Sequence, residues 1–229
     1  MKIIAIDSSG AACSTALWED GVVVAQALLQ NGNTHSVNLM PMLESMLASC
    51  GRDVSCADYI ACVTGPGSFT GVRIGVSSVR AVCAALEIPC IAVNALEALS
   101  QRSFAGVICP MLDARRSQVY CAAFSAGERL LKDAAVPVIE FLENVKKLKG
   151  PYFFTGDGAE AYEDIIRSEM GGEAEGVFIA NENERCVSAA DAAVLASKRV
   201  NEAILRHELM PYYLRAPQAE REYAEKHGQ

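Results

Sequence analysis

Positive charge is in short supply in this chain of 229 residues, which carries 20 Lys and Arg against 28 Asp and Glu. The formal net charge is therefore -8. Affinity for nucleic acid comes largely from Lys and Arg contacts to phosphates, so this balance argues against a protein that binds nucleic acid unaided. If RNA is involved, we expect a partner to hold it.

Metal-binding patterns are missing as well. The chain has three histidines, none within a few residues of another, and no Cys-x-x-Cys pair among its nine cysteines. These gaps remove the usual zinc and iron spacings and argue against a metal-dependent hydrolase. Cys50, Cys56 and Cys62 are evenly spaced, which leaves a ligand cluster as the minor alternative to core packing. We expect reduced, buried thiols and no metal site.

The start of the chain lacks a long hydrophobic run. The apolar stretch within Met1–Asp7 is far too short for a signal peptide or a membrane-spanning helix. Apolar residues make up 51% of the chain and charged residues 21%, as in ordinary globular proteins. The sequence therefore predicts a cytoplasmic protein without a membrane partner.

The two halves of the chain begin alike, each with a short apolar run, a small turn and a second apolar run. An acid, an aromatic residue and a glycine recur in the same register: Asp7, Trp18 and Gly21, then Asp113, Phe124 and Gly127. This faint duplication predicts two related α/β lobes, residues 1–103 and 104–215, followed by a charged tail at 216–229.

Periodicity places the remaining elements. Short apolar runs predict strands, and apolar residues at three- and four-residue steps predict helices. The expected strands lie at 59–63, 91–93, 108–113, 151–154 and 177–179. The expected helices lie at 34–50, 71–86, 95–102 and 188–204, with Pro41 kinking or delaying the first and Ser188 capping the last.

The most distinctive segment is TGPGSFTGVRIG at Thr64–Gly75, a glycine-rich turn from a strand into a helix. Free N–H groups at a helix start attract anions, so this turn and the residues after the first strand form a candidate nucleotide or anion site. That candidate site comprises Asp7, Ser8, Ser9, Gly65, Gly67, Ser68 and Thr70.

Two features weaken the phosphate interpretation of the turn. No Gly-Lys-Ser/Thr follows, and Thr70 stands where a dinucleotide fingerprint has its last glycine. The structural alternative is a tight turn capped by Ser68 or Thr70, with Gly71 and Gly75 allowing another helix to approach. Asp7 is ambiguous in the same way: it could coordinate a nucleotide-bound magnesium through water or cap its own turn, as could Asp113.

Several stretches together closely resemble the bacterial TsaB family, also called YeaZ. They are IIAIDSSGAACSTALWEDG at the start, GPGSFTGVRIG in the loop, LDARRSQVY in the second half and PYYLR near the end. The match covers nearly the whole chain. The resemblance implies an actin-like ATPase, ribonuclease-H-like fold with two lobes.

The resemblance also implies a role in making N6-threonylcarbamoyladenosine at position 37 of tRNAs that read codons starting with A. In that family TsaB is the non-catalytic dimerisation partner of TsaD, which transfers the threonylcarbamoyl group, and the ATPase TsaE is the third component. ATP and a metal ion are then expected in the partner subunits and tRNA only through the complex. The His-x-x-x-His metal motif of TsaD-like proteins is missing here.

The helices at 34–50 and 71–86 are the expected interface, because both combine apolar stripes with methionines or small residues. They would pack against the matching helices of TsaD, or of a second copy when TsaD is absent; the alternative is that they cover only their own sheet. The candidate interface residues are Met40, Leu43, Leu47, Gly71, Arg73, Gly75, Val76, Val79 and Cys83.

A contrasting hypothesis remains at this point, an actin-fold ATPase or small-molecule kinase that acts alone. It would use Asp7 and the glycine-rich turn. The usual glycine-threonine pattern of the first phosphate motif is missing after Asp7, which favours the scaffold interpretation, with no catalytic residues of its own.

Overall fold

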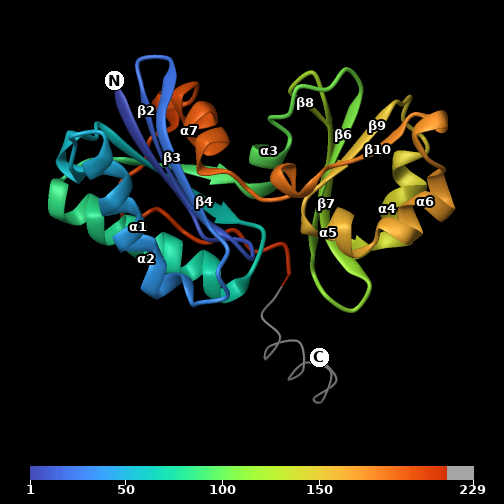
Figure 1. Cartoon of the computed structure of the whole chain (residues 1–229), viewed down its shortest axis with the longest axis horizontal. Coiled ribbons are helices and arrows are strands. Elements are labelled where there is room, and N and C mark those ends of the chain that lie inside the picture. Colours follow the sequence, from blue (N-terminus) through green and yellow to red (C-terminus); the bar gives the residue numbers. More distant parts are fainter. Residues whose placement is uncertain (216–229) are drawn as a thin grey trace.

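Two five-stranded sheets form the frame of this computed structural model, which describes residues 1–215 (Figure 1). The first sheet contains β1 (Lys2–Asp7), β2 (Cys13–Glu19), β3 (Val22–Leu29), β4 (Tyr59–Gly65) and β5 (Cys90–Asn94). Its order is β3-β2-β1-β4-β5. The first three strands are an antiparallel meander, and β4 and β5 run parallel to β1.

The second sheet repeats this arrangement. It contains β6 (Val107–Asp113), β7 (Gln118–Ser125), β8 (Glu128–Pro137), β9 (Tyr152–Thr155) and β10 (Val177–Ile179). Its order, β8-β7-β6-β9-β10, has the same topology as the first sheet, with the same mixture of antiparallel and parallel pairs. The prediction of two related lobes with mixed sheets is confirmed.

The duplicated hairpin turns explain why the repeat was visible in the sequence. The β2–β3 turn has Asp20 and Gly21 at φ 48° and 101°, and the β7–β8 turn has Ala126 and Gly127 at φ 50° and 83°. Two successive positive φ values are the signature of the two-residue turn that suits twisted strands. Glycine at the second position meets that requirement in both lobes.

Helices cover the outer face of each sheet, and two more lie between the sheets (Figure 1). The first sheet is covered by α1 (His35–Ser49) and α2 (Phe69–Leu86). The second is covered by α4 (Val138–Val145), α5 (Asp157–Ala161) and α6 (Glu163–Met170). The inner helices are α3 (Ala95–Leu99) and α7 (Ala189–Ser197), and short 3-10 turns lie at 54–56, 173–175, 182–184 and 200–202.

The inner faces of both sheets share one hydrophobic core. Trp18 of the first lobe and Phe124 of the second belong to this core together with the apolar sides of α3 and α7. Each lobe also has an outer core beneath its own helices. Because the two inner faces are buried against common helices, the lobes form one packed body.

The predicted boundary of the second lobe is wrong. After β10 the chain returns to the first lobe, where α7 packs on β1 and β2 and Ile204 forms a bridge to Cys90 at the edge of β5. Further on, Tyr212 N–H donates to Thr64 O at 2.7 Å. The second sheet therefore ends near residue 179, and residues 187–215 complete the first lobe; the predicted charged tail at 216–229 lies outside the described residues.

Two helices are shorter than predicted, and in a third the expected delay at Pro41 is absent. The helix expected at 188–204 ends at Ser197, although Ser188 caps it as expected by accepting from Ala190 N–H. The helix expected at 95–102 ends at Leu99. The first helix starts at His35 and continues through Pro41, so proline does not delay it.

Among residues 1–215, α2 is the one helix whose length and hydropathy would suffice to cross a membrane, and 33% of that stretch is buried. One such helix is weak evidence for a membrane span, because core helices of other proteins pass the same test. Here the buried side of α2 packs on its own sheet.

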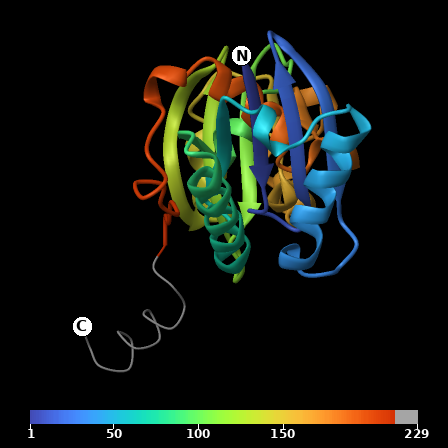
Figure 2. The same ribbon diagram turned by 90° about the vertical axis from the view of Figure 1, so that its left-hand side faces the viewer.

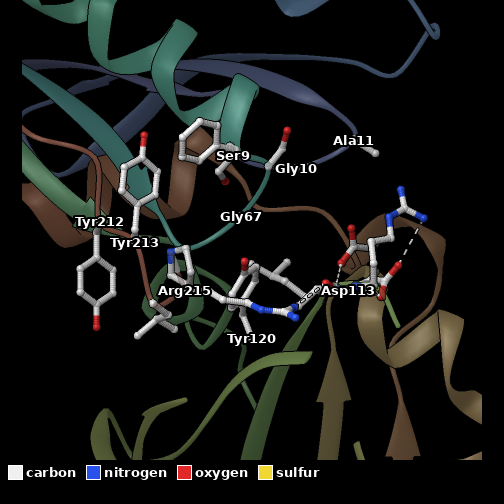
Figure 3. A pocket seen from close by; sticks show the side chains of 17 residues that line it. Ser9, Gly10, Ala11, Gly67, Asp113, Tyr120, Tyr212, Tyr213 and Arg215 are labelled. Atoms are coloured by element: carbon white, nitrogen blue, oxygen red, sulfur yellow. Dashed lines mark hydrogen bonds and ion pairs between the residues drawn. The ribbon is translucent and has the colours of Figure 1, made fainter. Parts of the chain in front are cut away.

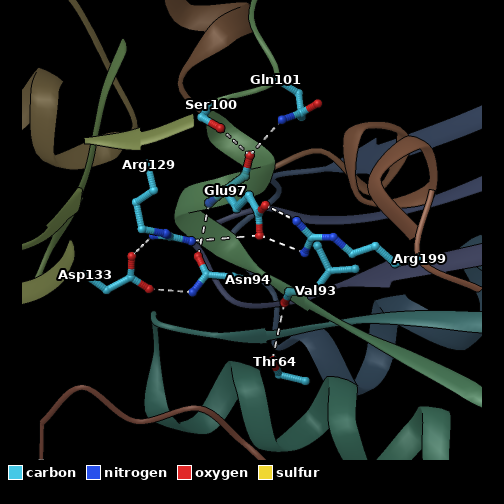
Figure 4. Close-up of polar contacts among 9 residues, drawn as sticks. All are labelled: Thr64, Val93, Asn94, Glu97, Ser100, Gln101, Arg129, Asp133 and Arg199. Atoms are coloured by element: carbon cyan, nitrogen blue, oxygen red, sulfur yellow. Dashed lines mark hydrogen bonds and ion pairs between the residues drawn. The ribbon is translucent and has the colours of Figure 1, made fainter. Parts of the chain in front are cut away.

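A polar network joins the lobes beside α3 (Figure 4). Glu97 accepts both arms of the Arg199 guanidinium, with one Nη1–Oε2 distance of 2.9 Å, and lies 3.9 Å from Arg129 of β8. Arg129 pairs in turn with Asp133, which accepts from Asn94 Nδ2 at 2.6 Å. The charges are half-buried and mutually paired, so this network ties β8 to α3 and to the end of α7.

Candidate functional site

A cleft of about 670 Å³ opens between the lobes (Figure 3). Three parts of the chain line it. The first lobe contributes residues 9–11 and 66–69, the second lobe contributes residues 112–115 with Tyr120 and Asp157, and the C-terminal segment contributes residues 212–215. The site therefore brings together segments from the start, middle and end of the sequence.

The glycine-rich turn is closed against its own chain. A Cβ on Gly67 would overlap the carbonyl oxygen of Ser9, and one on Gly71 would overlap that of Ser8. Ser68 N–H donates to Ser9 O at 2.7 Å, and Ser8 Oγ donates to Gly71 O at 2.8 Å. The glycines thus serve the approach of the β1–β2 turn, and the expectation that Gly71 and Gly75 admit another helix is wrong.

Ser68 caps the first turn of α2. Ser68 Oγ accepts from Gly71 N–H at 3.2 Å, and Ser68 O accepts from Val72 N–H at 2.9 Å. Ser68 is therefore the cap, as the structural alternative predicted. Of the candidate anion residues, Ser9, Gly67 and Ser68 line the cleft, whereas Asp7, Ser8, Gly65 and Thr70 do not. This arrangement does not fit a phosphate cradle.

Asp7 lies beneath the turn and is 1% exposed. Its Oδ1 accepts from Ser9 N–H at 2.9 Å, and burial raises the pKa of this carboxyl to about 6. Desolvation disfavours the charged form, while the Ser9 hydrogen bonds and the charge of His35 act in the opposite direction. Because Asp7 does not line the cleft, it caps its turn and does not face a ligand there.

Asp113 makes the same turn in the second lobe. Its Oδ1 accepts from Arg115 N–H at 2.9 Å and from the Tyr162 hydroxyl at 3.0 Å. Behind it, Asp157 accepts from Asp113 N–H at 2.9 Å, and burial raises the pKa of Asp157. Both acids therefore cap their own turns, and Asp113, unlike Asp7, also lines the cleft.

The C-terminal segment supplies residues that the sequence did not assign to the site. Tyr213 stacks on Phe69 with ring centroids 4.8 Å apart, and the Arg73 guanidinium lies 3.8 Å from the Phe69 centroid. Arg73 Nε donates to the Tyr213 hydroxyl at 2.9 Å, and Arg215 donates to Ala114 O of the other lobe at 3.2 Å. The signal available in the sequence was the aromatic and cationic cluster PYYLR.

Metal-binding groups do not gather in the part of the chain that the structure describes: no set of three or more His, Cys, Asp or Glu side chains there is placed to hold a metal ion. All nine cysteines are free. Cys62 is buried in β4, while Cys50 and Cys56 are half-buried. Their even spacing in sequence does not produce a ligand cluster.

Most of the predicted interface residues belong to the core beneath α1 and α2. The buried ones are Leu43, Leu47, Gly71, Gly75, Val76, Val79 and Cys83. The five apolar side chains among these seven face their own sheet and the two glycines face Ser8, so the prediction that they lie on the outward surface of the helices is wrong. Met40 is half-buried and Arg73 is exposed. The outward side of the two helices carries other residues, including Val37, which is 63% exposed, and Ser77 and Ala81.

A family model described as "TsaD: tRNA N6-adenosine threonylcarbamoyltransferase" matches residues 29–223. A protein of Bacillus subtilis (strain 168) named "tRNA threonylcarbamoyladenosine biosynthesis protein TsaB" is 33% identical over 98% of this chain and 99% of its own length. The chain belongs to the TsaB family, within the wider TsaD family.

Solved structures agree with TsaB membership. A Pseudomonas aeruginosa protein described as uncharacterized, "with similarity to peptidase YEAZ", superposes with a TM-score of 0.74 at 27% identity. It covers 93% of this TsaB-family chain and 99% of its own. The ethanolamine utilization protein EutJ from Carboxydothermus hydrogenoformans, at 12% identity, 84% and 89% coverage and a TM-score of 0.51, shows the shared actin-like fold alone.

Proposed function

We propose that this TsaB-family chain is the non-catalytic dimerisation subunit of a complex that makes N6-threonylcarbamoyladenosine in tRNA. In this complex a TsaD-like subunit transfers the threonylcarbamoyl group to adenosine 37 of tRNAs that read codons starting with A. The observation that carries the proposal is the 33% sequence identity to the TsaB of Bacillus subtilis over 98% of this chain. The name of that protein gives the pathway.

The closed turn supports the non-catalytic part of the proposal. Asp7, Ser8 and Ser9 stand where actin-like ATPases keep their first phosphate motif. Here the backbone of Ser8 and Ser9 is packed on Gly67 and Gly71, and Asp7 is buried under the same turn. A phosphate could enter only if these contacts opened. We therefore assign the nucleotide and the metal ion of the complex to the partner subunits, with a TsaE-like ATPase as third component.

The outward side of α1 and α2 is the surface that we assign to the TsaD-like partner, or to a second copy of this chain in its absence. The two helices lie side by side on one face of the first lobe (Figure 2). Exposed Val37, Ser77 and Ala81 offer a surface of apolar and small side chains that another helix pair can approach closely. We place this assembly in the cytoplasm, with tRNA bound through the complex.

Reconstitution tests the function directly. The TsaD-like and TsaE-like partners are incubated with ATP, threonine, bicarbonate and the enzyme that supplies the threonylcarbamoyl adenylate, with and without this chain, and the modified nucleoside is measured by chromatography of digested tRNA. We expect modification only when the chain is present and none from the chain alone. Clear ATP turnover by the isolated chain that disappears in Asp7→Ala would instead support an independent ATPase.

The assembly surface has its own test with a matched control. Val37 on α1 and Val22 on β3 are both 63% exposed, so Val37→Asp and Val22→Asp add the same charge at the same exposure. We expect Val37→Asp to abolish co-elution with the TsaD-like partner in size-exclusion chromatography, and Val22→Asp to leave it intact. Both variants should keep the melting temperature, whereas Val79→Asp should unfold the chain because Val79 is a core residue.

A further inference from the structure

The tip of the β6–β7 hairpin carries two adjacent arginines in an unusual backbone conformation. Arg115, Arg116 and Ser117 have φ values of 65°, 55° and 57°, so three successive residues are left-handed. Residues with a Cβ adopt this region rarely, and glycine is the residue that relieves it. The chain nevertheless places long cationic side chains at two of these positions, which points to a use for the side chains themselves.

Both arginines are available to a ligand. The Arg115 side chain is 88% exposed, and its ion pair with Asp113 is long at 3.4 Å. Arg116 is exposed and makes no hydrogen bond or ion pair with any other residue in the range 1–215. Asp113 pairs with Arg115 through Oδ2 and accepts the Arg115 N–H and the Tyr162 hydroxyl at Oδ1, and it has no ion pair with Arg116.

Exposed aromatic rings line the same cleft as Arg115, on the side opposite Asp113 (Figure 3). Tyr212 and Tyr213 are 40% and 38% exposed, and Arg215 lines the cleft with them. Arginines combined with accessible aromatic rings suit unpaired RNA, because the guanidinium groups contact phosphates and the rings stack on bases. An acidic protein surface would use the charges but not the rings.

We infer that the lining residues Arg115, Tyr212 and Arg215 of the interlobe cleft, together with Arg116 next to Arg115 at the hairpin tip, contact an unpaired segment of RNA within the assembled complex. This inference rests on the proposed function, which makes tRNA the RNA in question. Arg115 and Arg116 bind backbone phosphates and Tyr212 stacks on a base. The overall charge of -8 keeps the contact too weak to hold RNA alone, so the partner subunits supply the remaining affinity.

Salt dependence provides the decisive measurement. The full complex is titrated with fluorescently labelled, unmodified tRNA over a series of salt concentrations, using the natural chain and the double variant Arg115→Gly/Arg116→Gly. Each lost phosphate contact lowers the slope of log affinity against log salt by about 0.7 to 0.9. We expect a slope smaller by about 1.5 and an affinity reduced roughly tenfold at low salt, with an unchanged melting temperature because glycine suits this backbone.

Two further variants and one matched control sharpen the test. Arg115→Lys/Arg116→Lys keeps the charges and should keep the slope. Tyr212→Ala should reduce affinity roughly fivefold or more, the range of a lost base stack, without changing the slope. The control, Lys146→Ala/Arg167→Ala, removes two cations from helices remote from the cleft, where they pair with Glu169 and Glu163, and should bind tRNA normally.

The outcomes separate this inference from the proposed function. An unchanged slope for the glycine double variant, in a complex that still needs this chain, overturns the RNA contact and leaves the subunit role intact. Loss of TsaD-like partner binding by that variant also overturns it, in favour of a protein interface. The inference is supported if the Tyr212 and arginine variants differ from the natural chain only in measurements that include tRNA.

Discussion

The two lobes share a plan and differ in what is attached to it. Both have the same sheet order, the same hairpin turn and the same acid-capped turn after the first strand, with Asp7 in one and Asp113 in the other. The residues after the acid are Ser8-Ser9-Gly10 in the first lobe and Ala114-Arg115-Arg116 in the second. The first turn is therefore sealed by glycines, whereas the second extends charge toward solvent.

The outer helices differ in the same sense. The first lobe carries two long helices, α1 and α2, of 15 and 18 residues, while the second lobe carries α4, α5 and α6 of 8, 5 and 8 residues. Long helices offer continuous faces for assembly, and short ones only close the core. The two lobes therefore share their strands, whereas their turns and outer helices differ and serve different roles.

The largest expected effect is the steric overlap caused by replacing one glycine in each lobe. Gly71→Ala in the first lobe and Gly156→Ala in the second each place a Cβ into a backbone carbonyl, of Ser8 and Met111 respectively. Because backbone cannot move aside cheaply, we expect each to lower the free energy of unfolding by about 3 kcal/mol or more. Urea denaturation midpoints measure both.

Gly10→Ala is the matched control, since no atom lies within 4 Å of its Cβ position. That variant should be neutral or more stable by about 0.5 kcal/mol, because alanine restricts the unfolded chain. A Gly71→Ala protein with the midpoint of the natural chain would show that the first lobe does not depend on the closed turn.

Because Asp7 is buried, its effect on the free energy of unfolding should differ from that of Asp113. With a folded pKa of about 6 and an unfolded one near 4, Asp7 holds its proton more tightly when folded, so stability falls as pH rises through that window. Asp7→Asn keeps an acceptor for Ser9 N–H and removes the buried charge. We expect a gain of about 2 kcal/mol at neutral pH that vanishes below about pH 4.

Thermal unfolding across pH measures this gain. Asp113→Asn is the paired variant and should not stabilise, because Asp113 has an ion pair with Arg115 to lose. Equal gains in the two lobes, or a gain for Asp7→Asn that persists in acid, would contradict the assignment of Asp7 as the more costly buried charge.

The smallest expected effect concerns the seam between the lobes. Glu97→Ala leaves Arg129 and Arg199 without their shared carboxylate. Both arginines keep about a third of their exposure, so we expect a loss of about 1 to 2 kcal/mol in chemical denaturation, less than for a fully buried pair. The control Glu163→Ala removes an exposed pair with Arg167 and should cost less than about 0.5 kcal/mol.

The repeat could be predicted because its causes are local. A two-residue hairpin needs positive φ, which Gly21 and Gly127 supply, and buried strands must be apolar in sequence. The return of α7 to the first lobe could not be predicted, because its apolar residues would suit either sheet. Long-range contacts settle which sheet the end of the chain completes, among them the pairing of Cys90 with Ile204 and the packing of α7 on β1 and β2.

The site shows the same limit. The apolar stripe of α2 was visible, but a stripe does not reveal whether Val76 and Val79 face their own sheet or another subunit; packing on β1 and β4 decides this. The contact of Arg73 with Tyr213 joins residues 140 positions apart. No local pattern encodes such a pair, so the C-terminal side of the cleft was missed.

The return of residues 187–215 to the first lobe affects the order in which the two lobes can fold during synthesis. On the ribosome, the β1–β5 sheet emerges first but must wait for α7 and for Ile204, the bridge partner of Cys90, which are translated after the second sheet. Until then Ile3, Ala5 and Ala16 lack part of their cover. A premature stop codon shortly after β10 would thus damage chiefly the lobe synthesised first, while the later lobe would retain its own sheet and outer helices.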